Sequence, residues 1–181
     1  MNEKILKRCI MIFPEFENME IVDKIREKYD PFVNNVKPHV TLVFPFDSYI
    51  KSEDLEKYLN ETLSDEKIFD IRLKDVIKID DKTGKFLFLT LKDGNEKVKE
   101  LNKLLYSGIL EKYKPEFLNT VEFMPHMTLG KFDSSEKLNI AYENIKNMQD
   151  EFKSTIKKVS VEIIDENMDS IIEMEIDLKA K

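Results

Sequence analysis

One five-residue frame occurs twice in this chain, and each copy contains one of its two histidines. Residues 38–42 read PHVTL, and residues 125–129 read PHMTL. In each copy a proline precedes the histidine. The proline biases the residue on its own N-terminal side toward an extended backbone. The β-branched and apolar residues that follow favour a strand. The frame therefore predicts two strands, about half the chain length apart, that each open with a histidine.

Strand geometry predicts which way the side chains of each frame point. Residues i and i+2 of a strand face the same side, roughly 6.6–6.8 Å apart. His39 and Thr41 should therefore share one face, as should His126 and Thr128, while the apolar residue between each pair points into the core. Each frame presents an imidazole and a hydroxyl together on a stiff platform.

The order of elements around the two frames is also repeated. An apolar strand at 7–13 and a helix within 16–29 precede the first frame, whereas a strand at 85–91 and a helix ending near Gly108 precede the second. This order predicts two similar lobes rather than a solenoid. Because no glycine- or serine-rich linker divides the chain, we expect residues 1–181 to form a single domain made of two lobes.

The remaining elements follow from periodicity and turn residues. The strand of the first frame should break at Pro45, and Ser52 should cap the next helix. Residues 69–79 and 85–91 should form a hairpin with Gly84 in its turn. A helix is expected from Leu138 to Met148. The tail at 171–179 alternates, with Ile172, Met174, Ile176 and Leu178 predicted inside, and should pair with residues 154–164.

Composition limits the possible partners. The net charge is −7, and lysines alternate with acidic residues, so no basic stripe suited to long duplex nucleic acid is present. The apolar run around Cys9 is far shorter than the ~20 residues of a membrane span. Because Cys9 is the only cysteine, no internal disulfide is possible. We interpret Cys9 as a core residue and expect a cytoplasmic, monomeric protein.

The residue types of the two frames suit displacement at phosphorus. A neutral imidazole can take a proton from the attacking oxygen, and a protonated one can give a proton to the leaving oxygen. Threonine hydroxyls can donate hydrogen bonds to the non-bridging phosphate oxygens. Two histidines and one cysteine make a poor zinc set, and zinc-binding or phosphate-loop motifs are absent from the sequence. We therefore expect no metal and no cofactor.

These features resemble the 2H phosphoesterase superfamily, in which two H-x-[ST] motifs lie about half a chain apart and each opens a strand. The resemblance extends to the stretches CIMIFP, REKYDPFVNNVKPHVTLVFPF and EFMPHMTLGKF. It is strongest to the small bacterial branch of 2′-5′ RNA ligase-like and YjcG-like proteins.

The resemblance implies an α+β fold. Two similar lobes of antiparallel-rich sheet with flanking helices would be related by a pseudo-two-fold duplication around a central cleft. It also implies a metal-independent cyclic phosphodiesterase, a hydrolase acting on 2′,3′-cyclic phosphates or 2′-5′ phosphodiesters. His39 and His126 would be its acid–base pair, and Thr41 and Thr128 its phosphate holders. The substrate would be a nucleotide, a short oligonucleotide or an RNA terminus.

Two other functions remain open. The same fold could form a nucleotide-binding module without turnover, or a weak, reversible 2′-5′ RNA ligase. Beyond the motifs, Phe132 lies an even number of residues from His126 and should face the same side of the strand, so it is a candidate to stack on a base. Arg8 is a candidate to balance phosphate charge. Lys131 could do the same, although a solvated lysine is the simpler interpretation.

Overall fold

The computed structural model describes residues 4–180, which form strands and helices in a mixed order. The strands are β1 (Leu6–Ile12), β2 (Val40–Ser48), β3 (Phe69–Asp81), β4 (Gly84–Asp93), β5 (His126–Lys131), β6 (Phe152–Ile156), β7 (Lys158–Ile164) and β8 (Ser170–Asp177). The α-helices are α1 (Met19–Tyr29), α2 (Ser52–Thr62), α3 (Asn95–Leu105) and α4 (Ser135–Ile145). Short 3-10 turns cover Gly108–Tyr113 and Glu116–Asn119.

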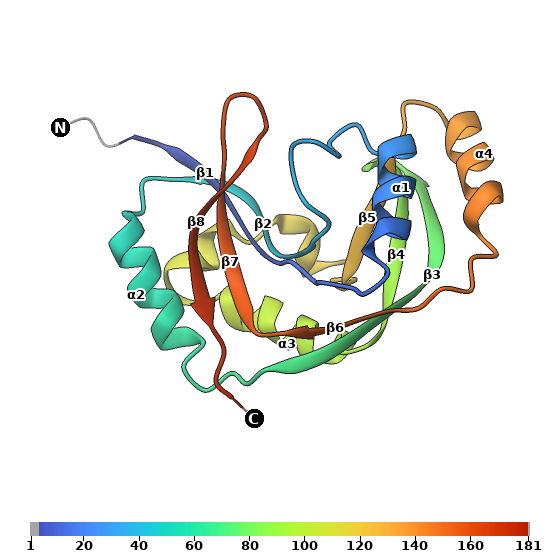
Figure 1. Cartoon of the computed structure of the whole chain (residues 1–181). Helices are drawn as coiled ribbons and strands as arrows, with labels where there is room; N and C mark the ends of the chain where they lie inside the picture. The colour runs from blue at the N-terminus through green and yellow to red at the C-terminus, as the bar shows by residue number, and fades with distance from the viewer. Residues whose placement is uncertain (1–3, 181) are drawn as a thin grey trace.

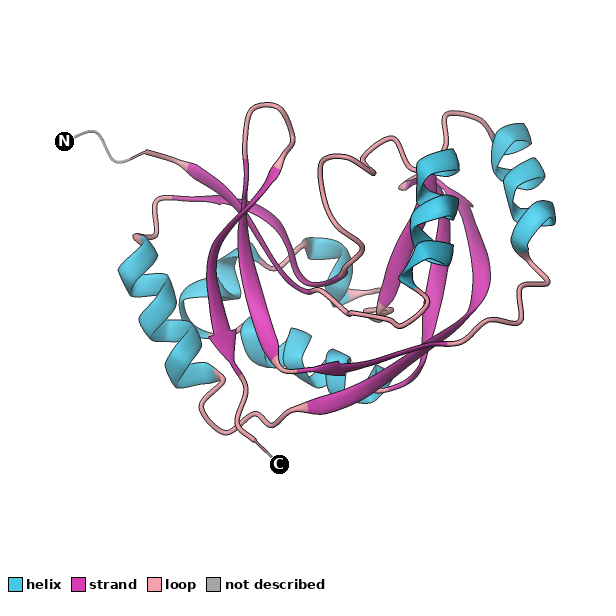
Figure 2. Cartoon of the chain, in the orientation of Figure 1, coloured by secondary structure: helices cyan, strands magenta, loops and turns pink. Residues whose placement is uncertain are grey.

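Within the described range, eight strands form one curled antiparallel sheet in the order β6-β3-β4-β5-β2-β1-β7-β8 (Figures 1 and 2). The two strands that carry the repeated frame, β2 and β5, are neighbours at its centre. Four strands lie on the β2 side and four on the β5 side. The chain is therefore an α+β protein with two similar lobes, and the lobes are joined into a continuous sheet.

Two of the helices, α1 and α3, cross between the lobes. Helix α1 precedes β2 in the chain but packs against β5, whereas α3 precedes β5 and packs against both β2 and β4. Helix α4 packs on β3 and β4, and α2 packs against β8 (Figure 1). Each motif strand is therefore supported by the helix that comes before the other motif strand.

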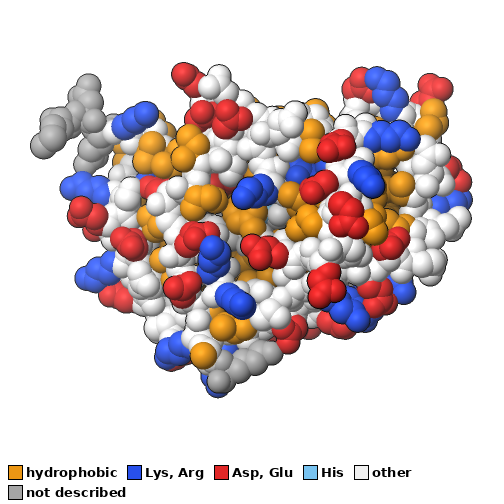
Figure 3. All heavy atoms as spheres, in the orientation of Figure 1, with side chains coloured by type: hydrophobic (Ala, Val, Ile, Leu, Met, Phe, Trp, Pro, Cys, Tyr) orange, Lys and Arg blue, Asp and Glu red, His pale blue; other side chains and the backbone are white. Residues whose placement is uncertain are grey.

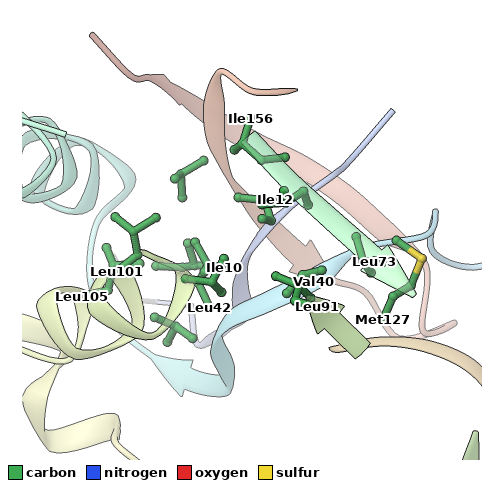
Figure 4. Packing of buried hydrophobic residues seen from close by; sticks show 14 of the residues in the cluster. Ile10, Ile12, Val40, Leu42, Leu73, Leu91, Leu101, Leu105, Met127 and Ile156 are labelled. Carbon is green, nitrogen blue, oxygen red and sulfur yellow. The ribbon is translucent and has the colours of Figure 1, made fainter. Parts of the chain in front are cut away.

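The core follows from the apolar alternation of the strands. Val40 and Met127, the middle residues of the two frames, are fully buried, as are Leu42 and Leu73. Figure 4 shows these side chains packing with those of β1 and α3. Burial of one face of β2 and β5 leaves the histidines and threonines on the other face.

Pro45 does not break the strand, contrary to the sequence-based prediction. Strand β2 continues to Ser48, and its register with β1 shifts between the pairs Ile10↔Val43 and Arg8↔Phe46. Two residues of β2, the second of them Pro45, therefore oppose one residue of β1. A proline is tolerated in such a bulge because the ladder needs no N–H there.

Ser52 is the first residue of α2 rather than its cap, and the capping position falls on Lys51. The Ser52 hydroxyl instead donates to Glu173 Oε1 at 2.5 Å. Glu173 sits at a bulge in β8, because Val161 pairs with Met174 while Glu162 pairs with Ile172. The bulge turns Glu173 inward and leaves Ile172 46% exposed, so the predicted alternation of the tail fails at this point.

The segment 154–164 forms two strands rather than one. Strand β6 pairs with β3 at one edge of the sheet, and β7 pairs with β1 and β8 in the other half. Only the second part therefore pairs with the tail as predicted. In the part of the chain that the structure describes, no helix has the length and apolar character of a membrane span.

Candidate active site

The two repeated frames lie side by side. Strands β2 and β5 are antiparallel, and Val40 pairs with Met127. In this register His39 lies opposite Thr128, and Thr41 lies opposite His126. Because the paired residues are buried in the core, all four motif side chains lie on the other face of the sheet. Residues from two distant parts of the sequence thus form one diagonal set of two imidazoles and two hydroxyls.

Both imidazoles are oriented in the same way by the backbone. His39 Nδ1 lies 2.8 Å from the carbonyl oxygen of Lys37, and His126 Nδ1 lies 2.7 Å from that of Met124. A carbonyl only accepts hydrogen bonds, so each Nδ1 carries the proton and each neutral ring has its lone pair on Nε2. Phe88 stacks on His126, with ring centroids 3.7 Å apart and an interplanar angle of 23°. This contact holds the second imidazole in place.

Burial makes both imidazoles harder to protonate. It lowers the pKa of His39 below its usual 6.5, against the opposing effect of the Lys37 carbonyl. Burial also lowers the pKa of His126 to about 4, and the charge of His39 adds to this effect. The two rings are thus within electrostatic reach of each other. The acid–base pair predicted from the sequence needs one neutral and one protonated ring, whereas the lowered pKa values favour two neutral rings in the free protein at neutral pH.

A cavity of about 250 Å³ opens on this face. His39, Thr41 and Thr128 are in its wall, and His126 lies beside it under Phe88. The rest of the wall comes from six strands and two loops, through Cys9, Met11, Asp30, Phe32, Val36, Pro45, Phe86, Lys131, Glu162, Ile164, Met168 and Ser170. The cavity thus has an aromatic side, an apolar side and several charged groups.

Lys131 lines the cavity, whereas Phe132 does not. Phe88 pairs with Thr128 but Leu87 pairs with Gly130, so β5 has a bulge at Leu129. The bulge reverses the alternation beyond it, and Lys131 rather than Phe132 faces the cavity. The prediction that Phe132 shares the face of His126 is therefore wrong.

Phe132 packs against Tyr29 of α1, with centroids 5.9 Å apart. It lines a neighbouring hollow of about 800 Å³, which shares Asp30, Phe32 and Lys131 with the cavity. The Lys131 ammonium lies 5.3 Å from the centre of the Phe32 ring and 6.0 Å from that of Phe86. Such cation–π contacts hold the charge near the cavity without neutralising it.

Arg8 does not reach the cavity either. It is fully buried, and its Nε and Nη2 donate to the two carboxylate oxygens of Glu173 at 2.6 and 2.7 Å. Its Nη1 donates to the carbonyl of Ile50 at 2.9 Å. These bonds use the guanidinium to tie β1 to β8 and to the start of α2. The structure therefore gives no support to Arg8 as a phosphate ligand.

The sequence analysis missed three residues of the site, Phe86, Phe88 and Glu162, and it favoured a solvated lysine as the simpler interpretation of Lys131. The alternation in KFLFLTL does contain a signal, because the buried Leu87 and Leu89 imply that both phenylalanines face the other side. Lys131 and Glu162 depend on a bulge and on long-range pairing. Cys9, predicted as a core residue, is 2% exposed, although it also borders the cavity.

No group of three histidine, cysteine or acidic side chains arranged to hold a metal ion is found between residues 4 and 180. The polar groups of the cavity wall are instead one imidazole, three hydroxyls, one thiol, one ammonium and two carboxylates, and the second imidazole lies beside them. This set can donate hydrogen bonds to an anion and exchange protons with it.

Comparison with known proteins gives a consistent result. The sequence profile of the 2′-5′ RNA ligase superfamily matches residues 13–167. A Geobacillus thermodenitrificans protein named "Putative phosphoesterase" is 25% identical over 154 residues, which are 84% of this chain and 85% of that protein. A Bacillus cereus protein with the same description is 29% identical over 138 residues, covering 70% of each chain.

The fold is also found among solved structures. Escherichia coli LigT complexed with 3′-AMP superposes with a TM-score of 0.66 and 16% identity, covering 97% of this chain and 99% of LigT. LigT complexed with ATP gives a TM-score of 0.62 with the same identity and coverage. At this identity the likeness establishes the shared fold.

Proposed function

Because the chain belongs to the 2′-5′ RNA ligase superfamily, we propose that it is a metal-independent phosphoesterase. It would open 2′,3′-cyclic phosphates or 2′-5′ phosphodiesters on nucleotides or RNA ends. The observation that carries this proposal is the diagonal set of two imidazoles and two hydroxyls on one face of β2 and β5. Both imidazoles keep Nε2 available for proton transfer.

In the proposed reaction, one imidazole takes a proton from a water molecule as its oxygen attacks phosphorus. The bond between phosphorus and one ribose oxygen breaks, and the other imidazole gives that oxygen a proton. The products are a phosphomonoester and a free hydroxyl. One ring gains a proton and the other loses one, so a proton exchange with solvent restores the starting state.

The second imidazole must be protonated before it can act as an acid. Both rings have lowered pKa values in the free protein. A bound phosphate is negatively charged, and a nearby negative charge raises the pKa of an imidazole. Substrate binding would therefore supply the condition under which one ring keeps its proton. Because both rings make the same kind of hydrogen bond to a backbone carbonyl, either ring could act as the acid.

The other groups of the cavity would stabilise the charge that builds up on the phosphate. Thr41 and Thr128 would donate hydrogen bonds to its non-bridging oxygens, and Lys131 would add a positive charge from the side. Figure 3 shows acidic and basic side chains interspersed over the face it presents. Together with the net charge of −7, this favours a nucleotide, a short oligonucleotide or an RNA end over a long duplex.

Two further features complete the proposal. LigT has been crystallised with 3′-AMP, ATP and NADP+, which supports nucleotide binding by this fold. The single, buried Cys9 suits a reducing cytoplasm. We propose a cytoplasmic monomer in which the two lobes form one domain.

The decisive experiment is incubation with the four 2′,3′-cyclic nucleotides, with product detected by chromatography. His39→Ala and His126→Ala should each lower kcat by about 10²–10⁴-fold, because each removes one proton transfer. Thr155→Ala on β6, outside the cavity, is the control. Binding without product would favour the binding module, and turnover unaffected by either histidine substitution would contradict the assignment of the site.

A further inference from the structure

The wall of the cavity contains one carboxylate that the proposed reaction does not use. Glu162 lies on β7 and is 3% exposed, yet its side chain borders the cavity. Ser170 Oγ donates a hydrogen bond to its Oε2. Among residues 4–180, no lysine, arginine or histidine forms an ion pair with it. A buried charge without a cationic partner is costly, and burial raises the pKa of this carboxyl. Hydrogen-bond donors on a bound ligand would stabilise its ionised form.

The other acidic residue of the wall is fully engaged. Asp30 pairs with Arg26, with Nη2 and Oδ2 2.8 Å apart, and its Oδ1 accepts from the backbone N–H of Phe32 at 2.9 Å. Lys131, the cation of the wall, lies on β5 and contacts the rings of Phe32 and Phe86. Glu162 lies on β7, in the other half of the sheet. The cavity therefore has a cationic, aromatic end and a separate end whose available polar group is Glu162.

The sheet register sets how far Glu162 lies from the phosphate position. Thr41 of β2 pairs with Met11 of β1, and Cys9 of β1 pairs with Glu162 of β7. Met11 itself pairs with Ser160, so Glu162 lies two strand spacings across the sheet and two residues along it from Thr41, about 12 Å in all. This span is comparable to that between a ribose phosphate and the Watson–Crick edge of its own base. A nucleotide with its phosphate at the motifs can thus present its base to Glu162.

The chemistry of a carboxylate selects among the bases. An ionised carboxylate only accepts hydrogen bonds. Guanine offers two adjacent donors on its Watson–Crick edge, N1–H and the N2 amino group. Adenine and cytosine place a donor next to an acceptor, and uracil has one donor between two carbonyls. Guanine is therefore the base whose edge matches both carboxylate oxygens.

We propose that Glu162, held by Ser170, recognises the donor edge of guanine, so that the preferred substrate is a guanosine cyclic phosphate or an RNA end that terminates in guanosine. This inference rests on the proposed function for the position of the phosphate. The apolar Ile164 and Met168 flank Glu162 in the wall and provide contact surface for the base.

The test compares kcat/KM for the four 2′,3′-cyclic nucleotides. A bidentate contact to a base is worth roughly 5- to 100-fold in discrimination, so the wild type should prefer guanosine over adenosine by about this factor. Glu162→Gln should lower the guanosine value and bring the ratio toward one. Glu175→Gln on β8, whose carboxylate pairs with Lys158 at 2.8 Å, is the matched control and should keep the wild-type ratio.

Two outcomes would overturn the inference: a wild type without guanosine preference, or a Glu162→Gln variant that changes all four substrates equally. If none of the four is turned over, the proposed function fails and the guanine site is decided by calorimetry. Tighter binding of 3′-GMP than of 3′-AMP, lost in Glu162→Gln, would support the site. Equal affinities would reject it.

Discussion

Each imidazole of the site should titrate below its usual pKa. Burial disfavours the charged ring, so the pKa of His39 should lie below 6.5 and that of His126 near 4. Because these are the only histidines, proton NMR as a function of pH should give two Hε1 resonances, assigned with His39→Asn. Inorganic phosphate should raise both midpoints. A midpoint at or above 6.5 for His126 without phosphate would contradict the burial argument.

The lowered pKa values also make stability depend on pH. An unfolded histidine takes up a proton near pH 6.5, whereas folded His126 does so near pH 4. The unfolded state therefore binds more protons between these values, and stability falls as the pH drops below 6.5. This site should cost about 1–2 kcal/mol between pH 7 and pH 5. Urea denaturation should show that loss in the wild type and a smaller one in His126→Asn.

The bulge in β5 predicts opposite effects for two adjacent residues. Lys131 faces the cavity, so Lys131→Ala should raise KM for an anionic substrate by roughly 10-fold, as expected for one lost charge contact. Phe132 packs on Tyr29 outside the cavity, so Phe132→Leu should leave KM within about twofold. Steady-state kinetics on the two variants measures the contrast. A larger KM effect at Phe132 would mean that the strand is not bulged as described.

At the level of elements, the end of α1 positions the first histidine. Arg26 is buried, donates through Nε to Asp30 at 2.9 Å, and donates through Nη2 to the carbonyl of Val36 at 2.9 Å. The next carbonyl, of Lys37, is the acceptor for His39 Nδ1. The ion pair thus fixes the loop from α1 to β2, and through that loop the direction of the imidazole.

Removing Arg26 should therefore affect both stability and catalysis. Arg26→Ala leaves the Asp30 carboxylate buried without its partner, which should cost about 3–5 kcal/mol in urea denaturation. Lys137→Ala, which breaks the exposed pair with Asp133, should cost under about 1 kcal/mol. In Arg26→Lys, kcat should fall more than KM rises, because a misdirected imidazole slows proton transfer. An unchanged kcat would limit Arg26 to a purely structural role.

The sequence predicted most elements, but not the irregularities that place the side chains around the site. Periodicity identified the motif strands and the helices, because burial repeats regularly along them. The expected alternation of side chains between the two faces of a strand failed at Phe132 and at Glu173, where bulges insert one residue. A bulge depends on pairing with a distant strand, and local sequence does not encode it. Glu162 was missed for the same reason, since the pairing of β7 with β1 brings it to the cavity.

In the whole molecule, the lobes are interwoven. Residues 69–156 supply the lobe of β3, β4, β5 and β6, and the segments before and after them supply the other lobe. Helix α1 packs across on β5. A side chain at Gly130 of β5 would lie 2.8 Å from Tyr29 Cβ and 3.0 Å from its carbonyl oxygen. This close approach joins the two lobes on the side of the sheet next to α1.

This interweaving predicts one cooperative unfolding transition. Leu42 belongs to the lobe of β2 and Leu73 to that of β3, and both are fully buried. Leu42→Ala and Leu73→Ala should each lower stability by about 2–5 kcal/mol, whereas Val121→Ala at an exposed position should change it little. Urea unfolding followed by far-UV and near-UV circular dichroism should give coincident curves that shift together in both core variants. If each variant instead gave two transitions, with only the mutated lobe unfolding earlier, the lobes would be independent domains. One lobe, with its motif, could then unfold while the other stayed folded.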